Sequence, residues 1–97
     1  MKAVFISYNQ ALTDRVGAII DRLGIRGFTK WELTEGRGSF DGEPHYGTHA
    51  WPSMNSSILS MVEDEKVEPL LEALRAMDST TKMQGCRAFV WSIEAMM

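Results

Sequence analysis

Four segments of the chain are rich in apolar, β-branched and aromatic residues, and their alternate positions fall on opposite faces of an extended chain. In the first segment, Val4, Ile6 and Tyr8 share one face, while Phe5 lies on the other. Because both faces carry apolar residues, we expect this strand to be covered on both sides. The pattern predicts strands at residues 2–8, 26–35, 54–62 and 86–95.

A helical repeat of apolar residues separates the first two predicted strands. Asn9 is suited to cap this helix, or Thr13 if the helix begins later. Gly24 followed by Ile25 is the pattern of a left-handed C-cap with a hydrophobic contact behind it. The apolar stripe consists of Leu12, Val16, Ile19, Ile20 and Leu23.

A second helical repeat lies between the third and fourth strands. Asp64 can cap this helix. Pro69 fits best if the regular part of the helix begins near Glu68, because proline is tolerated at the first helical position. The apolar stripe consists of Val67, Leu70, Leu71, Leu74 and Met77.

The predicted order of elements is β-α-β-β-α-β. Right-handed crossovers then place both helices on one face of a four-stranded antiparallel sheet, an α+β, ferredoxin-like fold. The strands nevertheless carry apolar residues on both faces, for example Phe5 beside Ile6 and Trp91 beside Val90. An uncovered apolar face predicts a partner, and a closed symmetric oligomer is the simplest one.

Residues 36–53 form the one long connection in this scheme. The segment is too rich in glycine and proline for a helix or a central strand, and it contains both histidines of the chain. Long loops in small domains are usually functional or disordered, and the aromatic residues here favour a functional loop. Those aromatic residues either contact a ligand or partner, or anchor the loop on its own domain; they are Phe40, Tyr46 and Trp51.

Composition narrows the class of protein. The 97 residues are enough for a single domain. A net charge of −3 argues against a general nucleic-acid binder, which needs a basic face. The single cysteine, Cys86, excludes an intramolecular disulfide and fits a reducing compartment. No apolar segment is long enough for a membrane span or a signal peptide, so we expect a cytoplasmic protein without membrane insertion.

The long loop also contains candidate metal ligands. His45 and His49 follow Asp41 and Glu43, and imidazole with carboxylate suits zinc, copper or nickel. The alternative is two solvent-exposed histidines in a polar loop. Cys86 is either a further ligand or a small buried side chain. No catalytic triad or paired acid and base is apparent, so we expect no enzyme.

Three stretches resemble the PII-like proteins, the trimeric nitrogen-regulatory signal transducers and their relatives. Residues 23–29 look like the family's turn from the first helix into the second strand. Residues 35–38 precede a long loop at the position of the family's T-loop. Thr80, Thr81, Lys82 and Met83 lead toward Phe89 and Val90 in a way that is similar to the family's B-loop and fourth strand.

This resemblance implies one PII-like domain over residues 1–97, with residues 36–53 as its T-loop-like segment. It further implies a homotrimer that binds a small effector, an adenine nucleotide or another anion, in the cleft between subunits. Such a protein acts on a target protein through the long loop. The resemblance places the effector at Arg37, Gly38, Lys82 and Arg87; the alternative for these residues is ordinary surface charge.

The runner-up hypothesis is a CutA-like trimer of the same fold that binds a divalent metal through His45 and His49. The two hypotheses share the scaffold and differ in the ligand of the loop region.

Overall fold

The computed structural model of the protein describes residues 1–36, 54–80 and 85–97. These residues form four strands and two α-helices in the predicted order, with one short 3-10 helix, η1, between β1 and α1. The elements are β1 (Lys2–Asn9), η1 (Gln10–Leu12), α1 (Thr13–Arg22), β2 (Phe28–Thr34), β3 (Asn55–Val62), α2 (Asp64–Ser79) and β4 (Cys86–Ser92).

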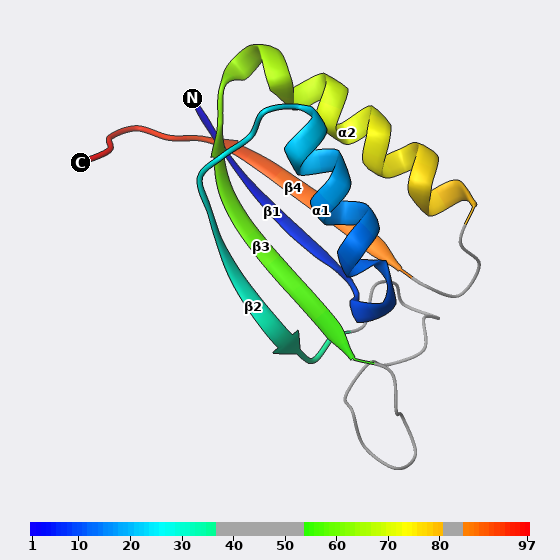
Figure 1. Cartoon of the computed structure of the whole chain (residues 1–97). Coiled ribbons are helices and arrows are strands. Elements are labelled where there is room, and N and C mark those ends of the chain that lie inside the picture. Colours follow the sequence, from blue (N-terminus) through cyan, green and yellow to red (C-terminus); the bar gives the residue numbers. More distant parts are fainter. Residues whose placement is uncertain (37–53, 81–84) are drawn as a thin grey trace.

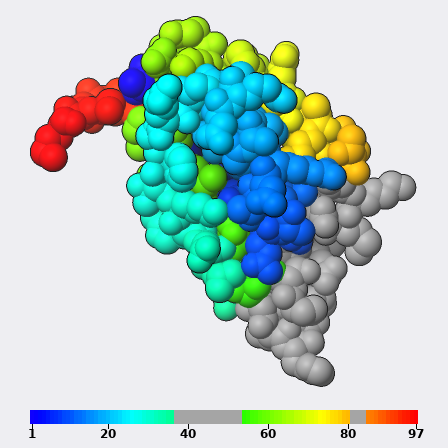
Figure 2. Space-filling model, in the orientation of Figure 1, coloured from blue at the N-terminus to red at the C-terminus, as the bar shows by residue number. Residues whose placement is uncertain are grey.

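The four strands make one antiparallel sheet in the order β2-β3-β1-β4. Both helices lie on the same side of this sheet, as Figure 1 shows. The predicted α+β, ferredoxin-like fold is therefore confirmed. Figure 2 shows the helix-covered side, where the C-terminal residues project from the rest of the molecule.

The hydrophobic core lies between the sheet and the two helices. It is built from alternate residues of the central strands and from the apolar stripes of α1 and α2, as expected from their periodicity. Cys86, Ala88 and Val90 of β4 pack against its margin. The buried residues of the core include Val4, Ile6, Tyr8, Val16, Ile20, Ile58, Val62, Leu70 and Leu74.

The predicted C-terminal end of the first helix is confirmed, whereas the N-cap of α1 is Leu12 and neither Asn9 nor Thr13. The side-chain oxygen of Asn9 accepts a hydrogen bond of 2.9 Å from the Ala11 N–H and so caps η1, and α1 begins at Thr13. At the other end Gly24 has a φ of +70°, a conformation that favours glycine. The Gly24 N–H donates to the Asp21 carbonyl and the Ile25 N–H to the Ile20 carbonyl, which is a Schellman motif.

The predicted start of the second helix is wrong. The helix α2 begins at Asp64, with Glu63 at the N-cap, and it continues through Pro69. Proline removes one backbone donor from the helical ladder and strains the preceding turn. Burial of Leu70 and Leu74 against the sheet stabilises the helix in spite of this local cost.

The second and fourth strands are shorter than predicted. The fourth ends at Ser92, because Ser92 pairs with Lys2, where β1 begins, and residues 93–95 have no strand beside them. The second spans Phe28–Thr34, with an irregular register between Trp31 and Thr34. Neither α-helix of the described residues is long and apolar enough to cross a membrane.

Candidate functional site

The sheet face opposite the helices carries large apolar side chains. Paired residues of an antiparallel sheet share a face, so the pairing defines cross-strand rows. Ala3 lies between Met61 and Trp91, and the next row along the strands places Phe5 between Leu59 and Phe89. Phe89 is 56% exposed and Trp91 50% exposed. An apolar surface of this kind is typical of an interface with another protein chain.

The next row on the same face is polar. Ser7 lies between Ser57 and Arg87, and Trp31 pairs with Ser57 on its far side. The Ser57 and Thr34 hydroxyls are 3.1 Å apart and share a hydrogen bond. We call Ser7, Trp31, Ser57 and Arg87 the polar row. It lies at the end of the sheet where Gly36, Met54 and Gly85 flank the undescribed segments.

Arg87 supplies the positive charge of the polar row. Its side chain is exposed, and the guanidinium group is suited to bind phosphate or carboxylate through two parallel hydrogen bonds. Arg37, Gly38 and Lys82, the other residues predicted to contact an effector, lie outside the described residues. The predicted anion site therefore stays a prediction, and the structure places one of its four residues.

Cys86 lies on the helix-facing side of β4. It pairs with Tyr8 and packs against the core. Burial, with a smaller contribution from the negative charge of Asp78, raises the pKa of the Cys86 thiol to about 11. Metals bind the thiolate, so burial does not favour Cys86 as a ligand.

The predicted metal ligands His45 and His49 lie outside the described residues. Over residues 1–36, 54–80 and 85–97, no group of three or more histidine, cysteine, aspartate or glutamate side chains is arranged to hold a metal ion. The metal site at His45 and His49 therefore stays a prediction.

Tyr8 brings a hydroxyl group into the core beside Cys86. Its side chain is fully buried, and within the described part of the chain its Oη atom has no hydrogen-bond partner. The Thr13 and Ser56 hydroxyls lie near the phenol, and each donates its own proton to a backbone carbonyl: Thr13 Oγ1 to Gln10 at 2.6 Å, and Ser56 Oγ to Glu32 at 2.5 Å. Burial raises the pKa of the Tyr8 phenol above its usual value.

Asn55 connects the polar row to the start of the long loop. It is 7% exposed, and its side-chain amide donates to Ser7 Oγ at 3.4 Å. A Cβ atom added to Gly36 would lie only 2.6 Å from Nδ2 of Asn55, so Gly36 packs directly on that amide. The sequence analysis missed Ser7, Asn55 and Gly36 as a group, because their contacts and the burial of Asn55 become visible only in the structure.

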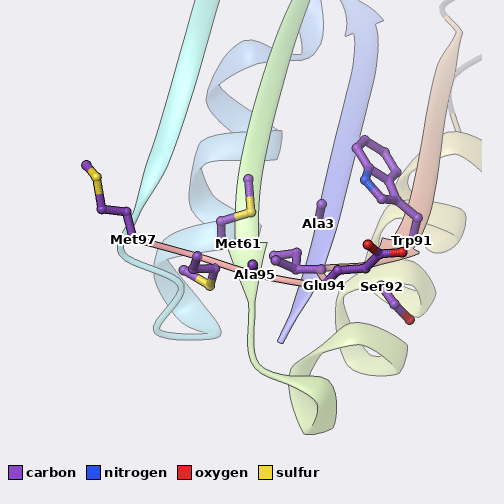
Figure 3. Close-up of a pocket in the computed structure, with 9 residues that line it drawn as sticks. Ala3, Met61, Trp91, Ser92, Glu94, Ala95 and Met97 are labelled. Atoms are coloured by element: carbon purple, nitrogen blue, oxygen red, sulfur yellow. The ribbon is translucent and has the colours of Figure 1, made fainter.

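The opposite end of the open face has a hollow of about 610 Å³. Ala3, Met61 and Trp91 form its sheet side, and residues 92–97 run across the strand ends beneath them (Figure 3). Most of its lining is apolar, and it lies away from the polar row. Ser92 and Glu94 supply the polar groups of this lining.

Three comparisons with known proteins add to this geometry. A family model described as nitrogen regulatory protein P-II matches residues 1–97. No curated protein matches the chain.

Solved structures share the fold. One is CPII, a nitrogen regulatory PII-like protein from Thiomonas intermedia K12 bound to ADP, AMP and bicarbonate, at 21% identity and a TM-score of 0.72. The match covers 97% of this chain and 88% of that chain. Another is a PII-like signalling protein from Thermus thermophilus, at 24% identity and a TM-score of 0.63, covering 93% of this chain and 83% of that chain.

Proposed function

The chain belongs to the nitrogen regulatory protein P-II family, and we propose that it is a signalling protein that binds an adenine nucleotide or a similar small anion next to Arg87. The observation that carries the proposal is the position of Arg87. It is an exposed cation in a row of hydroxyl groups, at the sheet end where both undescribed segments begin and end. CPII, which has the same fold, binds ADP, AMP and bicarbonate.

The chemistry of the polar row supports an anionic ligand. The guanidinium group donates several hydrogen bonds in a fixed geometry that matches phosphate and carboxylate oxygens. The hydroxyl groups of Ser7 and Ser57 lie beside it in the same row, and the Trp31 ring offers a surface on which a base can stack. Arg37, Gly38 and Lys82 would complete the site from the two undescribed segments.

We propose further that the protein is a homotrimer whose open sheet faces pack together. The support is the pair of apolar rows, which neither helix covers. A closed symmetric assembly would bury Phe89 and Trp91 while leaving the polar row at the margin of the interface. An effector bound there would lie close to a neighbouring subunit.

The output of this protein would be a contact between residues 36–53 and a target protein. Effector binding beside Gly36 and Met54 would change the surface that this segment presents, which is a known kind of molecular switch. In this proposal the protein regulates a target and performs no catalysis itself.

Native mass spectrometry with ADP, AMP and ATP tests the effector site. We expect Arg87→Gln to weaken nucleotide binding about tenfold or more, because a hydrogen-bonded charge is lost. Arg75→Gln is the matched control: it removes the same charge from the exposed surface of α2, where Arg75 Nη1 lies 3.9 Å from Glu68 Oε2. Equal binding by both variants would reject Arg87 as a contact. Uptake of zinc without any nucleotide would favour the metal hypothesis.

A further inference from the structure

The hollow at the far end of the open face arises from an uneven row of side chains. Ala3 of β1 pairs with Met61 of β3 on one side and with Trp91 of β4 on the other. The small alanine leaves space between two large neighbours, which stand on either side of it in Figure 3. Met61 is 39% exposed and Trp91 is 50% exposed, so a ligand in the hollow can touch both side chains.

Methionine sulfur is concentrated at this hollow. The chain has seven methionines, and three of them line it: Met61, Met96 and Met97. The last two belong to the segment after β4, which runs beneath the strand ends (Figure 3). All three side chains are exposed or partly exposed. Methionine is unbranched and has three rotatable bonds, so these thioether groups can turn toward a common ligand.

The chemistry of the lining suits one class of ion. A thioether is a soft and uncharged sulfur ligand, and soft sulfur ligands favour Cu(I) over the hard ions that need oxygen ligands. The face of the Trp91 ring attracts a cation, and the carboxylate of Glu94 in the same lining offsets a single positive charge. Thioethers, an aromatic face and one carboxylate together favour a soft monovalent cation.

We propose that the hollow binds Cu(I) through the thioether groups of Met61 and Met96, beside the face of Trp91. Met97 lies at the end of the same segment and is available as a further sulfur ligand. All of these residues belong to one chain, so we expect one ion per chain.

This site is separate from the other ligand sites proposed for the protein. Its ligands are thioethers, whereas the predicted metal site in the long loop uses the imidazoles of His45 and His49. It lies at the opposite end of the sheet from Arg87, and it does not depend on the proposed function. Failure of nucleotide binding would leave it standing.

Calorimetric titration with silver nitrate at pH 5 and pH 7.5 tests the ligand class. Silver(I) has the charge and softness of Cu(I) and needs no reductant. The protein carries Cys86→Ala, which removes the only thiol of the chain. Histidine has an ordinary pKa of about 6.5 and is mostly protonated at pH 5, whereas thioethers take up no proton there. We expect one silver ion per chain at both pH values. Binding that is lost at pH 5 would assign the ion to histidine and overturn the proposal.

Two matched pairs of substitutions locate the ion. Met61→Leu with Met96→Leu removes two thioethers of the hollow and keeps its apolar surface, since leucine and methionine have similar volumes. Met54→Leu with Met77→Leu is the control, because neither residue lines the hollow. We expect the first pair to weaken silver binding about tenfold or more and the second to change it less than about twofold. Equal binding by the two pairs would overturn the proposal.

Tryptophan fluorescence of proteins that keep all their methionines gives a second measurement. A silver ion beside the Trp91 ring should quench its emission. We expect Trp91→Phe to lose this response and Trp31→Phe, which changes a ring of the polar row, to keep it. A response that persists in Trp91→Phe would place the ion outside the hollow and overturn the proposal.

Discussion

Tyr8 shows how a single residue departs from the rules that build the rest of the core. Its ring fills space between the sheet and the helices, as the alternation of β1 requires. Its hydroxyl group is desolvated there without a hydrogen-bond partner in the described part of the chain. An unpaired buried hydroxyl costs free energy, because it gives up water and gains nothing in return.

We therefore expect Tyr8→Phe to raise the free energy of unfolding by about 1 kcal/mol. Phenylalanine keeps the ring and removes only the desolvated hydroxyl. Urea denaturation of both proteins measures the difference. A clear loss of stability would show that the hydroxyl makes a favourable bond, for example to a buried water molecule.

The neighbouring Cys86 gives a prediction about pH. Its pKa of about 11 lies above the ordinary value of 9.0, since burial disfavours the thiolate. At pH 7.5 the folded protein should react with iodoacetamide roughly a hundredfold more slowly than the urea-unfolded chain, because the reactive thiolate is that much scarcer. The rate in the folded protein should rise with pH up to about pH 11. Equal rates at pH 7.5 would contradict the burial of the thiol.

At the scale of the elements, Gly36 packs closely on Asn55 just after the end of β2. Gly36→Ala would place a Cβ atom 2.6 Å from the Asn55 amide, so that the amide must leave Ser7 or the backbone must shift. We expect a loss of about 1–3 kcal/mol in the free energy of unfolding, the usual cost of overpacking. Thermal or urea denaturation measures it.

Gly27→Ala is the control for this substitution, because a Cβ atom at Gly27 would meet nothing within 4 Å. The double variant Gly36→Ala with Asn55→Ala should regain part of the lost stability, since it removes the clashing amide. If Gly36→Ala were as stable as Gly27→Ala, the contact between Gly36 and Asn55 would not constrain the loop.

The elements themselves were predictable from the sequence because their signals are local. Alternation in β1 and the glycine after α1 each reflect a short-range physical requirement, and both predictions were confirmed. The start of α2 was predicted wrongly. Pro69 disfavours a helix locally, and the packing of Leu70 and Leu74 on the sheet outweighs that local cost. The end of β4 depends on where its partner β1 begins, which no local pattern contains.

At the scale of the whole molecule, the site is the part that sequence alone could least define. Arg87 was predicted from the resemblance to a family, and its place in the polar row became visible only through strand pairing. Ser7, Ser57 and Asn55 come from strands far apart in the chain, so no spacing in the sequence relates them. Backbone hydrogen bonds, such as those from the Asn9 N–H to Gly85 and from the Gln10 N–H to Met54, do not depend on residue type, so the sequence does not predict them.

The two sides of the sheet allow a final prediction about assembly. Phe89 lies on the open face and is 56% exposed, while Phe28 is 50% exposed and pairs with Ser60, on the side that faces the helices. If the open faces pack together in a homotrimer, Phe89→Glu places a charge in an apolar interface and should dissociate it. Phe28→Glu adds the same charge at similar exposure on the other side and should leave the trimer intact.

Native mass spectrometry and sedimentation of the two variants give the answer. A trimeric wild type, a monomeric Phe89→Glu and a trimeric Phe28→Glu would assign the open face to the interface. Dissociation by Phe28→Glu alone would place the contact on the edge of β2. A monomeric wild type would reject the trimer, and the two exposed rows that contain Phe89 and Trp91 would then need a different protein partner.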